Sequence, residues 1–501
     1  MLLLTQSKPR NNFILLITLS SLMLLFMLGI QELWTQEIRW AQICRTMLAT
    51  HDYLHPYLNG YPYYDKPLLS YWLMIVSSLL WGHFSEWSMR LPSALAGITA
   101  VGCIYYLGKN LVNQRVGIIA GWMLITTYYF IFWSRTANSD MLNVAGILLA
   151  WAWYVAHKDK SSFFNYAIFF LIMALASLCK GLLATVIPLL VITPDLIYQK
   201  HWKNHLRPAL FFALIPAIIV YLLPFLASSH IGGQTYRESG LMEVFRENVL
   251  RFTQPFDHKG PIYLYFYMLP LYLLPWAFFF IPAVFSIKKE WPILSVGQRW
   301  IAWSLLLVFI FFTASGSRRD YYTLPMVPFG ILFTASWIER KLKQKPGLAN
   351  FIKSYIIIFY ILLFSLFGIV KPYHYSSGGL RDFATQLQTQ ATTIQPWQNW
   401  TVALLNPKDQ APYYVNAIKQ INYPVPDRQA EYPIQQLLQY WPAIQSHPAN
   451  TIFITSAKYV PEIAPYLTQY TMVTTPDYPD EKWWNGHDKD DAVAFIPKHS
   501  G

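Results

Sequence analysis

Residues 13–33 read FILLITLSSLMLLFMLGIQEL, an apolar run in which the first charged side chain is Glu32. A helix of about 20 predominantly apolar residues is needed to cross the hydrocarbon core of a bilayer. The run is therefore predicted to span a membrane. No small-residue cleavage site follows it, which indicates an anchor and not a removed signal peptide.

The composition of the whole chain agrees with this first span. Of 501 residues, 54% are hydrophobic, 17% are aromatic and 13% are charged, whereas a soluble protein carries about 25% charged residues. These values argue against a cytosolic enzyme, a disordered chain or a nucleic-acid-binding protein. Three scattered cysteines are too few for a disulfide framework or a zinc knuckle. Eleven spans are predicted, at 13–33, 90–108, 116–134, 141–157, 163–180, 182–198, 208–228, 261–285, 300–314, 320–338 and 351–371.

Lysine and arginine indicate how these spans are oriented. They recur in every second loop, at 8–10, 109–115, 158–160, 200–207, 288–299 and 340–345. By the positive-inside rule these loops and the N-terminus are cytoplasmic. Residues 67–82 are apolar but short, and counting them as a crossing would break the alternation, so a juxtamembrane helix on the outer side is predicted there. Acidic residues then collect in the outer loops 34–89, 135–140, 229–260 and 315–320.

Residues 372–501 differ in character from the rest of the chain. Short apolar runs at 401–406, 451–456, 471–475 and 492–496 are typical of strands, and helix-like stretches lie at 411–420 and 433–446. The predicted fold is mainly α: a polytopic helical membrane domain over 1–371, with about eleven spans plus juxtamembrane helices, and a small α/β C-terminal domain over 372–501 on the outer side.

The first outer loop is the richest in polar chemistry. Residues 33–72 read LWTQEIRWAQICRTMLATHDYLHPYLNGYPYYDKPLLSYW. Trp40, Ile43, Cys44, Met47 and Leu48 have helical spacing, which predicts an interfacial helix with its apolar side toward lipid. The following turn-rich segment ends in an acid and a lysine, at 65 and 66. It either orders around a phosphate or is an aromatic belt with a snorkelling lysine.

This loop resembles the first outer loop of polyprenyl-phosphate-dependent glycosyltransferases, the group that includes the lipid A aminoarabinose transferase and, more distantly, the protein O-mannosyltransferases. Further motifs follow in order, at SRTANSDML (134–142), LASLCKG (175–181), ENVLRF with FDHKGP (247–261) and SGSRRDYYTLPMVP (315–328). The resemblance implies a C-type transferase of the bacterial inner membrane. Such an enzyme takes a sugar from undecaprenyl or another polyprenyl phosphate in the outer leaflet and passes it, with inversion, to lipid A, another glycolipid or a protein.

The leaving group of this reaction is a phosphate, whose departing charge arginine and lysine can stabilise. Asp140 is expected in a catalytic role at an outer span end where the family keeps an acid, although it could equally cap its helix. Asp65, beside the loop lysine, is also expected in a catalytic role. Candidate phosphate-binding residues, each of which could instead be a solvated or salt-bridged surface group, are Lys66, Arg39, Arg251, Lys259, Arg318, Arg319 and Tyr321, with Tyr322 beside the last.

The resemblance implies no certain cofactor, and it points to a metal only through two residues. Asp65 and His258 match positions that can share zinc in the lipid A aminoarabinose transferase. Two ligands without a tight spacing motif are a weak signal for a metal site. The other histidine of the family pattern is replaced here by Asn248.

One departure from the family concerns its catalytic aspartate. The usual Asp-Glu-x-Arg reads Gln36-Glu37-Ile38-Arg39 in this chain, and an amide cannot act as a general base. Three interpretations follow. Glu37 takes the role of the base, or the acceptor is a phosphate that needs no strong base, or the protein is a weak or inactive relative. The second interpretation favours lipid A or another anionic lipid as the acceptor.

Three other classes of protein are alternatives to a polyprenyl-phosphate-dependent glycosyltransferase. A transporter would place ionisable residues or broken segments at the membrane midplane, whereas the predicted spans carry few charges at their centres. A phosphoethanolamine-type transferase would need a nucleophile and metal ligands in 372–501, where four histidines show no ligand spacing. An O-antigen ligase would not explain the order of the motifs.

Overall fold

The computed structural model describes most of the chain, namely residues 9–58, 61–231, 260–407, 410–423, 450–479 and 490–498, together with a few positions between 435 and 446. Its contacts divide the chain into two compact units. The first comprises Met1–Leu28 and Ile43–Phe367, and the second comprises Gly29–Gln42 and Gly368–Gly501.

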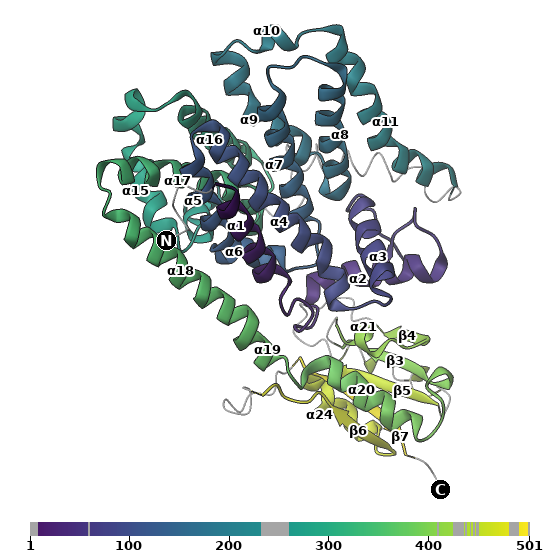
Figure 1. Ribbon diagram of the computed structural model, residues 1–501. Helices are drawn as coiled ribbons and strands as arrows, with labels where there is room; N and C mark the ends of the chain where they lie inside the picture. Colours follow the sequence, from purple (N-terminus) through teal and green to yellow (C-terminus); the bar gives the residue numbers. More distant parts are fainter. Residues whose placement is uncertain are drawn as a thin grey trace. The chain divides into compact units, whose positions relative to one another are not determined.

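The first unit is built almost entirely of helices (Figure 1). They are α1 (Pro9–Leu25), α2 (Thr35–Thr50, which begins in the second unit), α3 (Leu69–Trp81), α4 (Glu86–Leu111), α5 (Gln114–Ile125), α6 (Tyr128–Ser134), α7 (Asp140–His157), α8 (Phe163–Lys180), α9 (Leu183–Tyr198), α10 (Trp202–His205), α11 (Pro208–Ile231), α14 (Leu264–Tyr272), α15 (Ala277–Glu290), η3 (Trp291–Ile293), α16 (Val296–Ala314), η4 (Asp320–Met326), α17 (Val327–Gln344), α18 (Leu348–Ser365) and the π-helical η5 (Leu366–Val370), with a two-residue hairpin of β1 (Tyr57–Leu58) and β2 (Tyr61–Pro62).

The hydrophobic runs of the sequence lie in these helices because only a helix satisfies its own backbone in lipid. Among the described residues, five helices are long and apolar enough to cross a membrane, or six if one bent pair counts as a single span. Helices also cover the other predicted spans, but several are shorter. The mostly helical membrane class is confirmed, and the number of eleven crossings stays a prediction.

Two predicted spans are interrupted. The run 116–134 forms α5 and α6, which are bent by 68° at their junction. There the hydroxyls of Thr126 and Thr127 donate to carbonyls one turn back, to Trp122 O at 2.6 Å and Met123 O at 2.8 Å, a pattern that bends helices. The run 261–285 forms α14 and α15, which are separated at Pro275, a residue without a backbone donor.

The interior of the first unit is one continuous apolar core, formed by residues from α1 to η5. Helix α4 packs on α5 and α7, α8 packs on α7 and α11, and α16 packs on α9 (Figure 1). Trp151 of α7 stacks on Phe329 of α17 with ring centroids 5.4 Å apart. Helices distant in sequence are therefore held together by aromatic contacts as well as by their small residues.

The second unit is an α/β domain with a five-stranded sheet in the order β4-β3-β5-β7-β6. β3 runs parallel to both β4 and β5, and β7 is antiparallel to both β5 and β6. Its elements are α19 (Lys371–His374), α20 (Gly379–Thr392), η6 (Trp397–Asn399), β3 (Thr401–Leu405), α21 (Ala411–Val415), β4 (Lys419–Tyr423), β5 (Thr451–Ser456), η7 (Ala457–Tyr459), α24 (Val460–Ile463), η8 (Ala464–Tyr466), β6 (Tyr470–Thr474) and β7 (Ala492–Pro497).

Both faces of this sheet are covered. Phe383 and Leu387 of α20 pack against Val402 and Ile452 on one face, and Ile463 packs with Phe453 and its neighbours on the other. The helix expected over 411–420 ends at Val415, because Asn416 adopts a left-handed conformation with φ of 47°. β4 begins three residues further on, at Lys419. Most of the helix expected over 433–446 lies outside the described residues.

Candidate functional site

The centre of the candidate site is an ion pair between the ends of two packed helices. Asp140 is the first residue of α7 and Lys180 is the last residue of α8. Because α7 and α8 pack side by side, these ends meet, and Lys180 Nζ pairs with Asp140 Oδ1. The two side chains are each 12% exposed. A carboxylate at a helix N-terminus and an ammonium at a C-terminus are both favoured by the helix dipoles.

Asparagine side chains hold this junction in place. Asn143 Nδ2 donates to Ala176 O at 3.2 Å and to Gly181 O at 3.4 Å, so it fastens the end of α8 to α7. Asn138 Oδ1 accepts the backbone N–H of Asp140 at 2.8 Å. The family motif at 134–142 therefore supplies both the acid and the backbone bond that fixes it.

Lys180 also faces an aromatic ring. Its Nζ lies 5.5 Å from the ring centroid of Tyr322 in η4, within the range of a cation–π interaction. Lys180 was not among the predicted site residues, although it belongs to the motif at 175–181. The signal that would have revealed it is a cation at the outer end of a predicted span, the same signal that identified Arg318 and Arg319.

Tyr322 is part of a tyrosine cluster, which we define as Tyr129, Tyr272, Tyr321 and Tyr322. The rings of Tyr321 and Tyr322 lie 4.9 Å apart, and Trp133 links Tyr321 to Tyr129 through contacts of 5.7 and 6.1 Å. Tyr129 stacks on Tyr272 at 3.7 Å. The cluster joins α6, α14 and η4, and its hydroxyls are hydrogen-bond donors of the kind that orient a sugar or a phosphate.

Charged side chains flank the tyrosine cluster. Tyr272 OH donates to Asp320 Oδ2 at 2.9 Å. Arg319 Nη1 donates to Tyr321 OH at 2.6 Å and its guanidinium lies over the same ring. The neighbouring Arg318 differs, since it donates to two backbone carbonyls, Thr313 O at 3.1 Å and Gly260 O at 2.8 Å. Of the two predicted arginines, Arg319 is therefore the one associated with the cluster, and Arg318 connects the segment before η4 to the last turn of α16 and to Gly260.

Lys66 lies in the loop that leads into α3, near the same end of α8. Its Nζ donates to Asp65 O at 2.9 Å, and the side chain is half-buried. Ser70, one turn later, donates to Cys179 O at 2.9 Å, directly beside Lys180. His55 fixes the start of the segment that precedes Lys66, because its ring contacts Asp52 at 2.8 Å and Ser228 O at 2.9 Å. The structure thus brings the predicted lysine loop to the α8 end of the first unit.

Glu37 and Arg39 lie in the second unit by contacts. Glu37 occupies the first turn of α2, is fully buried, and accepts the backbone N–H of Trp34 at 3.3 Å. Arg39 is exposed. The apolar side of α2 does not face lipid as predicted, because Trp40, Ile43, Cys44 and Met47 are buried within the protein. In the first unit, the Cys44 thiol contacts Tyr71 O of α3 at 3.7 Å.

Three predicted site residues, Arg251, His258 and Lys259, lie outside the described residues, as does most of the outer loop 229–260. Of the predicted zinc ligands only Asp65 is described, and its side chain is exposed. Within the described residues no three histidine, cysteine or acidic side chains gather as a metal site would require. The described donors alone do not fit a zinc ion.

Known proteins share sequence with this chain. Residues 65–227 match the family described as dolichyl-phosphate-mannose-protein mannosyltransferase. The undecaprenyl phosphate-alpha-4-amino-4-deoxy-L-arabinose arabinosyl transferase of Shewanella sediminis is 28% identical over 359 residues, which are 68% of this chain and 62% of that protein. The protein of the same name from Pseudomonas paraeruginosa is 26% identical over 358 residues with the same coverage. The chain thus spans a little under two thirds of these relatives.

Solved structures share its fold. The crystal structure of ArnT from Cupriavidus metallidurans bound to undecaprenyl phosphate matches with a TM-score of 0.69 at 17% identity, over 96% of this chain and 97% of that one. An oligosaccharyltransferase from Archaeoglobus fulgidus, in complex with zinc and sulfate, matches with a TM-score of 0.54 at 10% identity, over 91% of this chain and 69% of that one. The resemblance predicted from the sequence motifs is confirmed. In sequence and in fold, the chain resembles the polyprenyl-phosphate-dependent membrane glycosyltransferases, and among them the aminoarabinose transferases.

Proposed function

We propose that this protein is an inverting glycosyltransferase that takes a sugar from an undecaprenyl or other polyprenyl phosphate and passes it to lipid A or another glycolipid. The observation that carries the proposal is the position of Lys180, the last residue of α8, which is paired with Asp140 at the start of α7 and faces Tyr322 of η4. A lipid-linked donor presents its phosphosugar at such helix ends. The relatives named above support a 4-amino-4-deoxy-L-arabinose donor.

The proposed reaction is a single displacement at the anomeric carbon of the donor sugar. An acceptor oxygen bonds to the anomeric carbon while the bond from that carbon to the donor phosphate breaks, and the electron pair leaves with the polyprenyl phosphate. Lys180, Lys66 and Arg319 stabilise the charge that develops on this phosphate. Tyr321 and Tyr322 orient the phosphosugar. Asp140 is a positioning residue, because its ion pair holds the Lys180 ammonium in place.

The base is needed only for some acceptors. A hydroxyl acceptor loses its proton as the new bond forms, and on the family resemblance alone Glu37 is the candidate carboxylate to accept it, since position 36 carries an amide. A phosphate acceptor is already ionised near neutral pH and needs no base. The presence of Gln36 therefore favours the phosphate of lipid A, or of another anionic lipid, as the acceptor. Transfer to a protein hydroxyl is the alternative.

The proposed topology follows from the basic loops. Residues 1–371 form the membrane transferase domain in eleven crossings, with the N-terminus in the cytoplasm. Residues 372–501 form an outer-side α/β domain, which is periplasmic in a bacterium with two membranes. Arg39, Arg251 and Lys259 are proposed as further donor-phosphate contacts, and Asp65 with His258 as a metal pair, on the family resemblance alone.

The test of this function is mass spectrometry of lipid A, other glycolipids and glycoproteins from cells with the gene intact, deleted, or complemented with the wild type, Lys66→Ala or Lys160→Ala. Lys66→Ala should fail to restore the product, because the donor phosphate loses a cation. Lys160 is a matched control, since it is an exposed lysine next to α8 that is distant in sequence from every motif.

The acceptor can be read from the same spectra. Loss of an aminopentose from lipid A in the deletion strain is the expected result. If a sugar disappears from a protein instead, the lipid acceptor is wrong. If no glycan changes although the protein is made, the transferase function is wrong.

A further inference from the structure

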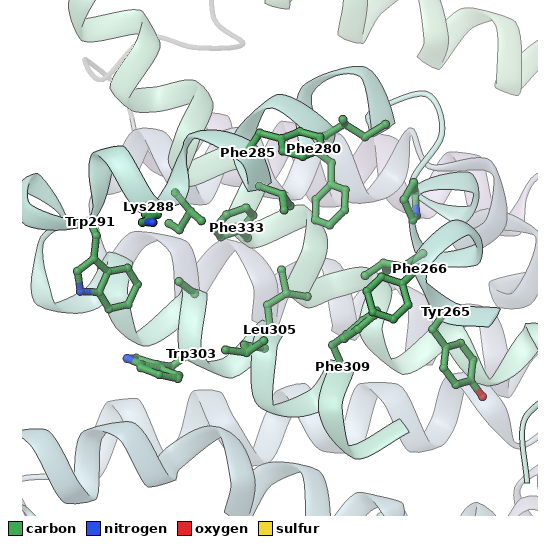
Figure 2. Close-up of a pocket in the computed structure, with 17 residues that line it drawn as sticks. Tyr265, Phe266, Phe280, Phe285, Lys288, Trp291, Trp303, Leu305, Phe309 and Phe333 are labelled. Carbon is green, nitrogen blue, oxygen red and sulfur yellow. The ribbon is translucent and has the colours of Figure 1, made fainter. Parts of the chain in front are cut away.

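A groove of about 960 Å³ opens on the first unit between α14, α15 and α16, with Phe333 of α17 behind it. Figure 2 shows its two ends: Lys288, Trp291 and Trp303 lie at one end, and Tyr265, Phe266 and Phe309 lie at the other. Its volume is at the upper end of the range of about 300–1,000 Å³ for small-molecule pockets. It shares no residue with the ion pair or the tyrosine cluster of the candidate site.

The walls of the groove are apolar and largely uncovered. Phe285 is 83% exposed and Phe266 is 64% exposed, and Lys288 is the single charged residue among those that line the groove. Exposed apolar side chains of a membrane domain face the hydrocarbon of the bilayer. In a membrane domain, the occupant that fits such walls is an acyl chain.

The end near Lys288 has the features of a head-group site. A smaller cavity of about 280 Å³ shares Trp291 and Trp303 with the groove and adds Arg299. Arg299 lies 6.0 Å from the Trp291 ring and donates one bond to Pro292 O at 3.2 Å, while its buried Nε has no partner within the described residues. Tryptophan is enriched at the boundary between acyl chains and head groups, and two tryptophans gather at this end of the groove.

The neighbouring acids, Asp195 and Glu290, do not neutralise Lys288 and Arg299. Asp195, which also lines the smaller cavity, is already bound by Lys158 at 3.2 Å and by His201 at 2.6 Å. Glu290 is bound by Arg340 at 2.9 Å and by Lys341 at 2.8 Å. Lys288 and Arg299 have no ion pair within the described residues, so the end of the groove carries net positive charge.

We propose that this groove binds one anionic phospholipid of the leaflet that borders the α15–α16 connection. The anionic head group lies between Lys288 and Arg299, the glycerol region lies beside Trp291 and Trp303, and an acyl chain runs along the groove toward Phe266 and Phe309. From Lys288 to Ile281, α15 rises about 10 Å, so the cation and the apolar wall are placed on one helix. This inference goes beyond sugar transfer and does not depend on it.

The probes are phosphatidylglycerol and phosphatidylcholine with identical acyl chains, added to purified, delipidated protein in detergent and counted by native mass spectrometry. The wild type should retain phosphatidylglycerol preferentially. Lys288→Gln should weaken its retention about fivefold, the effect of one basic residue at a lipid surface, and should leave phosphatidylcholine unchanged. Lys289→Gln is the matched control, because Lys289 is the exposed neighbour and does not line the groove.

A second variant tests the apolar part of the site. Ala302→Trp places a large side chain in the groove and should remove retention of both lipids, while Arg299→Gln should act like Lys288→Gln. Equal retention of the two lipids by the wild type would overturn the proposal, as would equal effects of Lys288→Gln and Lys289→Gln. If undecaprenyl phosphate displaces phosphatidylglycerol and Lys288→Gln does not alter the competition, the groove holds the donor chain instead.

Discussion

Lys180 holds its charge between a carboxylate on α7 and a tyrosine ring of η4. Without these partners, a lysine at the end of a helix could extend its ammonium into solvent. Asp140 and Asn143 together fix it, the first through the ion pair and the second through bonds to Ala176 O and Gly181 O. A cation held in this way needs no reorganisation when charge develops on a donor phosphate.

We expect Lys180→Ala to lower kcat on the order of 10² to 10³-fold, the usual cost of losing one preorganised donor. Lys180→Arg should recover part of this loss, because the charge is kept while its geometry changes. The measurement is turnover of purified enzyme in detergent, with Lys160→Ala as the control. Unchanged kcat in a folded Lys180→Ala protein would show that the ion pair is purely structural.

Arg135 in the same motif has a structural role. Its Nη1 donates to Met23 O and Phe26 O at 2.9 Å, and its Nη2 donates to Met27 O at 3.0 Å. These carbonyls lie at the C-terminal end of α1 and immediately after it, where helical partners are missing. The motif at 134–142 therefore contains both Arg135, which caps the C-terminal end of α1, and Asp140, the first residue of α7.

Arg135→Ala should destabilise the protein by about 3 kcal/mol, because several carbonyls near the end of α1 lose a charged donor. Arg135→Lys should restore only part of this stability, since an ammonium cannot reach all of the carbonyls that the guanidinium fork reaches. Thermal unfolding in detergent provides the measurement. Arg207→Ala is the control, because Arg207 is exposed in a loop, and an Arg135→Ala protein as stable as this control would contradict the role.

At the scale of elements, the contact between α7 and α8 determines where the ion pair forms. Gly146 of α7 lies against Ala176 of α8 so closely that a Cβ added to the glycine would overlap the Cβ of the alanine. Gly146 is nearly two turns from Asp140, and Ala176 is about one turn from Lys180. The small side chains let the helices approach, as is common between membrane helices.

Gly146→Ala should push the helices apart, with a cost of about 1–3 kcal/mol from overpacking and a loss of turnover as Asp140 and Lys180 separate. The double variant Gly146→Ala/Ala176→Gly should recover both properties, because only one Cβ then occupies the contact. Gly102→Ala is the control, since the nearest atom to its added Cβ is Ile17 Cδ1 at 3.9 Å. Thermal unfolding and turnover are the measurements, and failure of the double variant to recover either would refute the explanation.

At the scale of the whole molecule, the cationic excess of +12 belongs mainly to loops predicted on one side of the membrane. Its distribution is a topological signal. The few cations in motifs predicted on the outer side are Lys66, Lys180 and Arg319, to which the catalytic proposal assigns a phosphate. Lys288 and Arg299, in a loop predicted on the cytoplasmic side, are those to which the lipid proposal assigns a head group.

This topology can be tested with single cysteines, because the three native cysteines are buried. A membrane-impermeant maleimide should label Thr389→Cys in intact spheroplasts, since Thr389 is exposed in the α/β unit that is predicted outside. Lys160→Cys should be labelled only after the membrane is permeabilised. Labelling of Lys160→Cys without labelling of Thr389→Cys in intact spheroplasts would show the reverse orientation. Labelling of both positions would contradict the span assignment.

The sequence by itself determined the membrane class, the helices over the apolar runs and the family resemblance. These depend on local properties, because lipid requires a continuous apolar helix and a motif is read from adjacent residues. It also located Asp140 and Lys66, each within a motif.

Only the tertiary structure decided which side chains meet. Lys180 forms an ion pair with Asp140, which lies forty positions earlier in the chain. At the break of the predicted span, Thr126 Oγ1 accepts a hydrogen bond from Trp276 Nε1 at 3.1 Å, and Trp276 lies in the turn immediately before α15, 150 positions later in the chain. The apolar side of α2 is buried in protein and not in lipid. Hydrophobic periodicity shows that a face is hidden from water, and the packing of distant helices decides whether protein or lipid hides it.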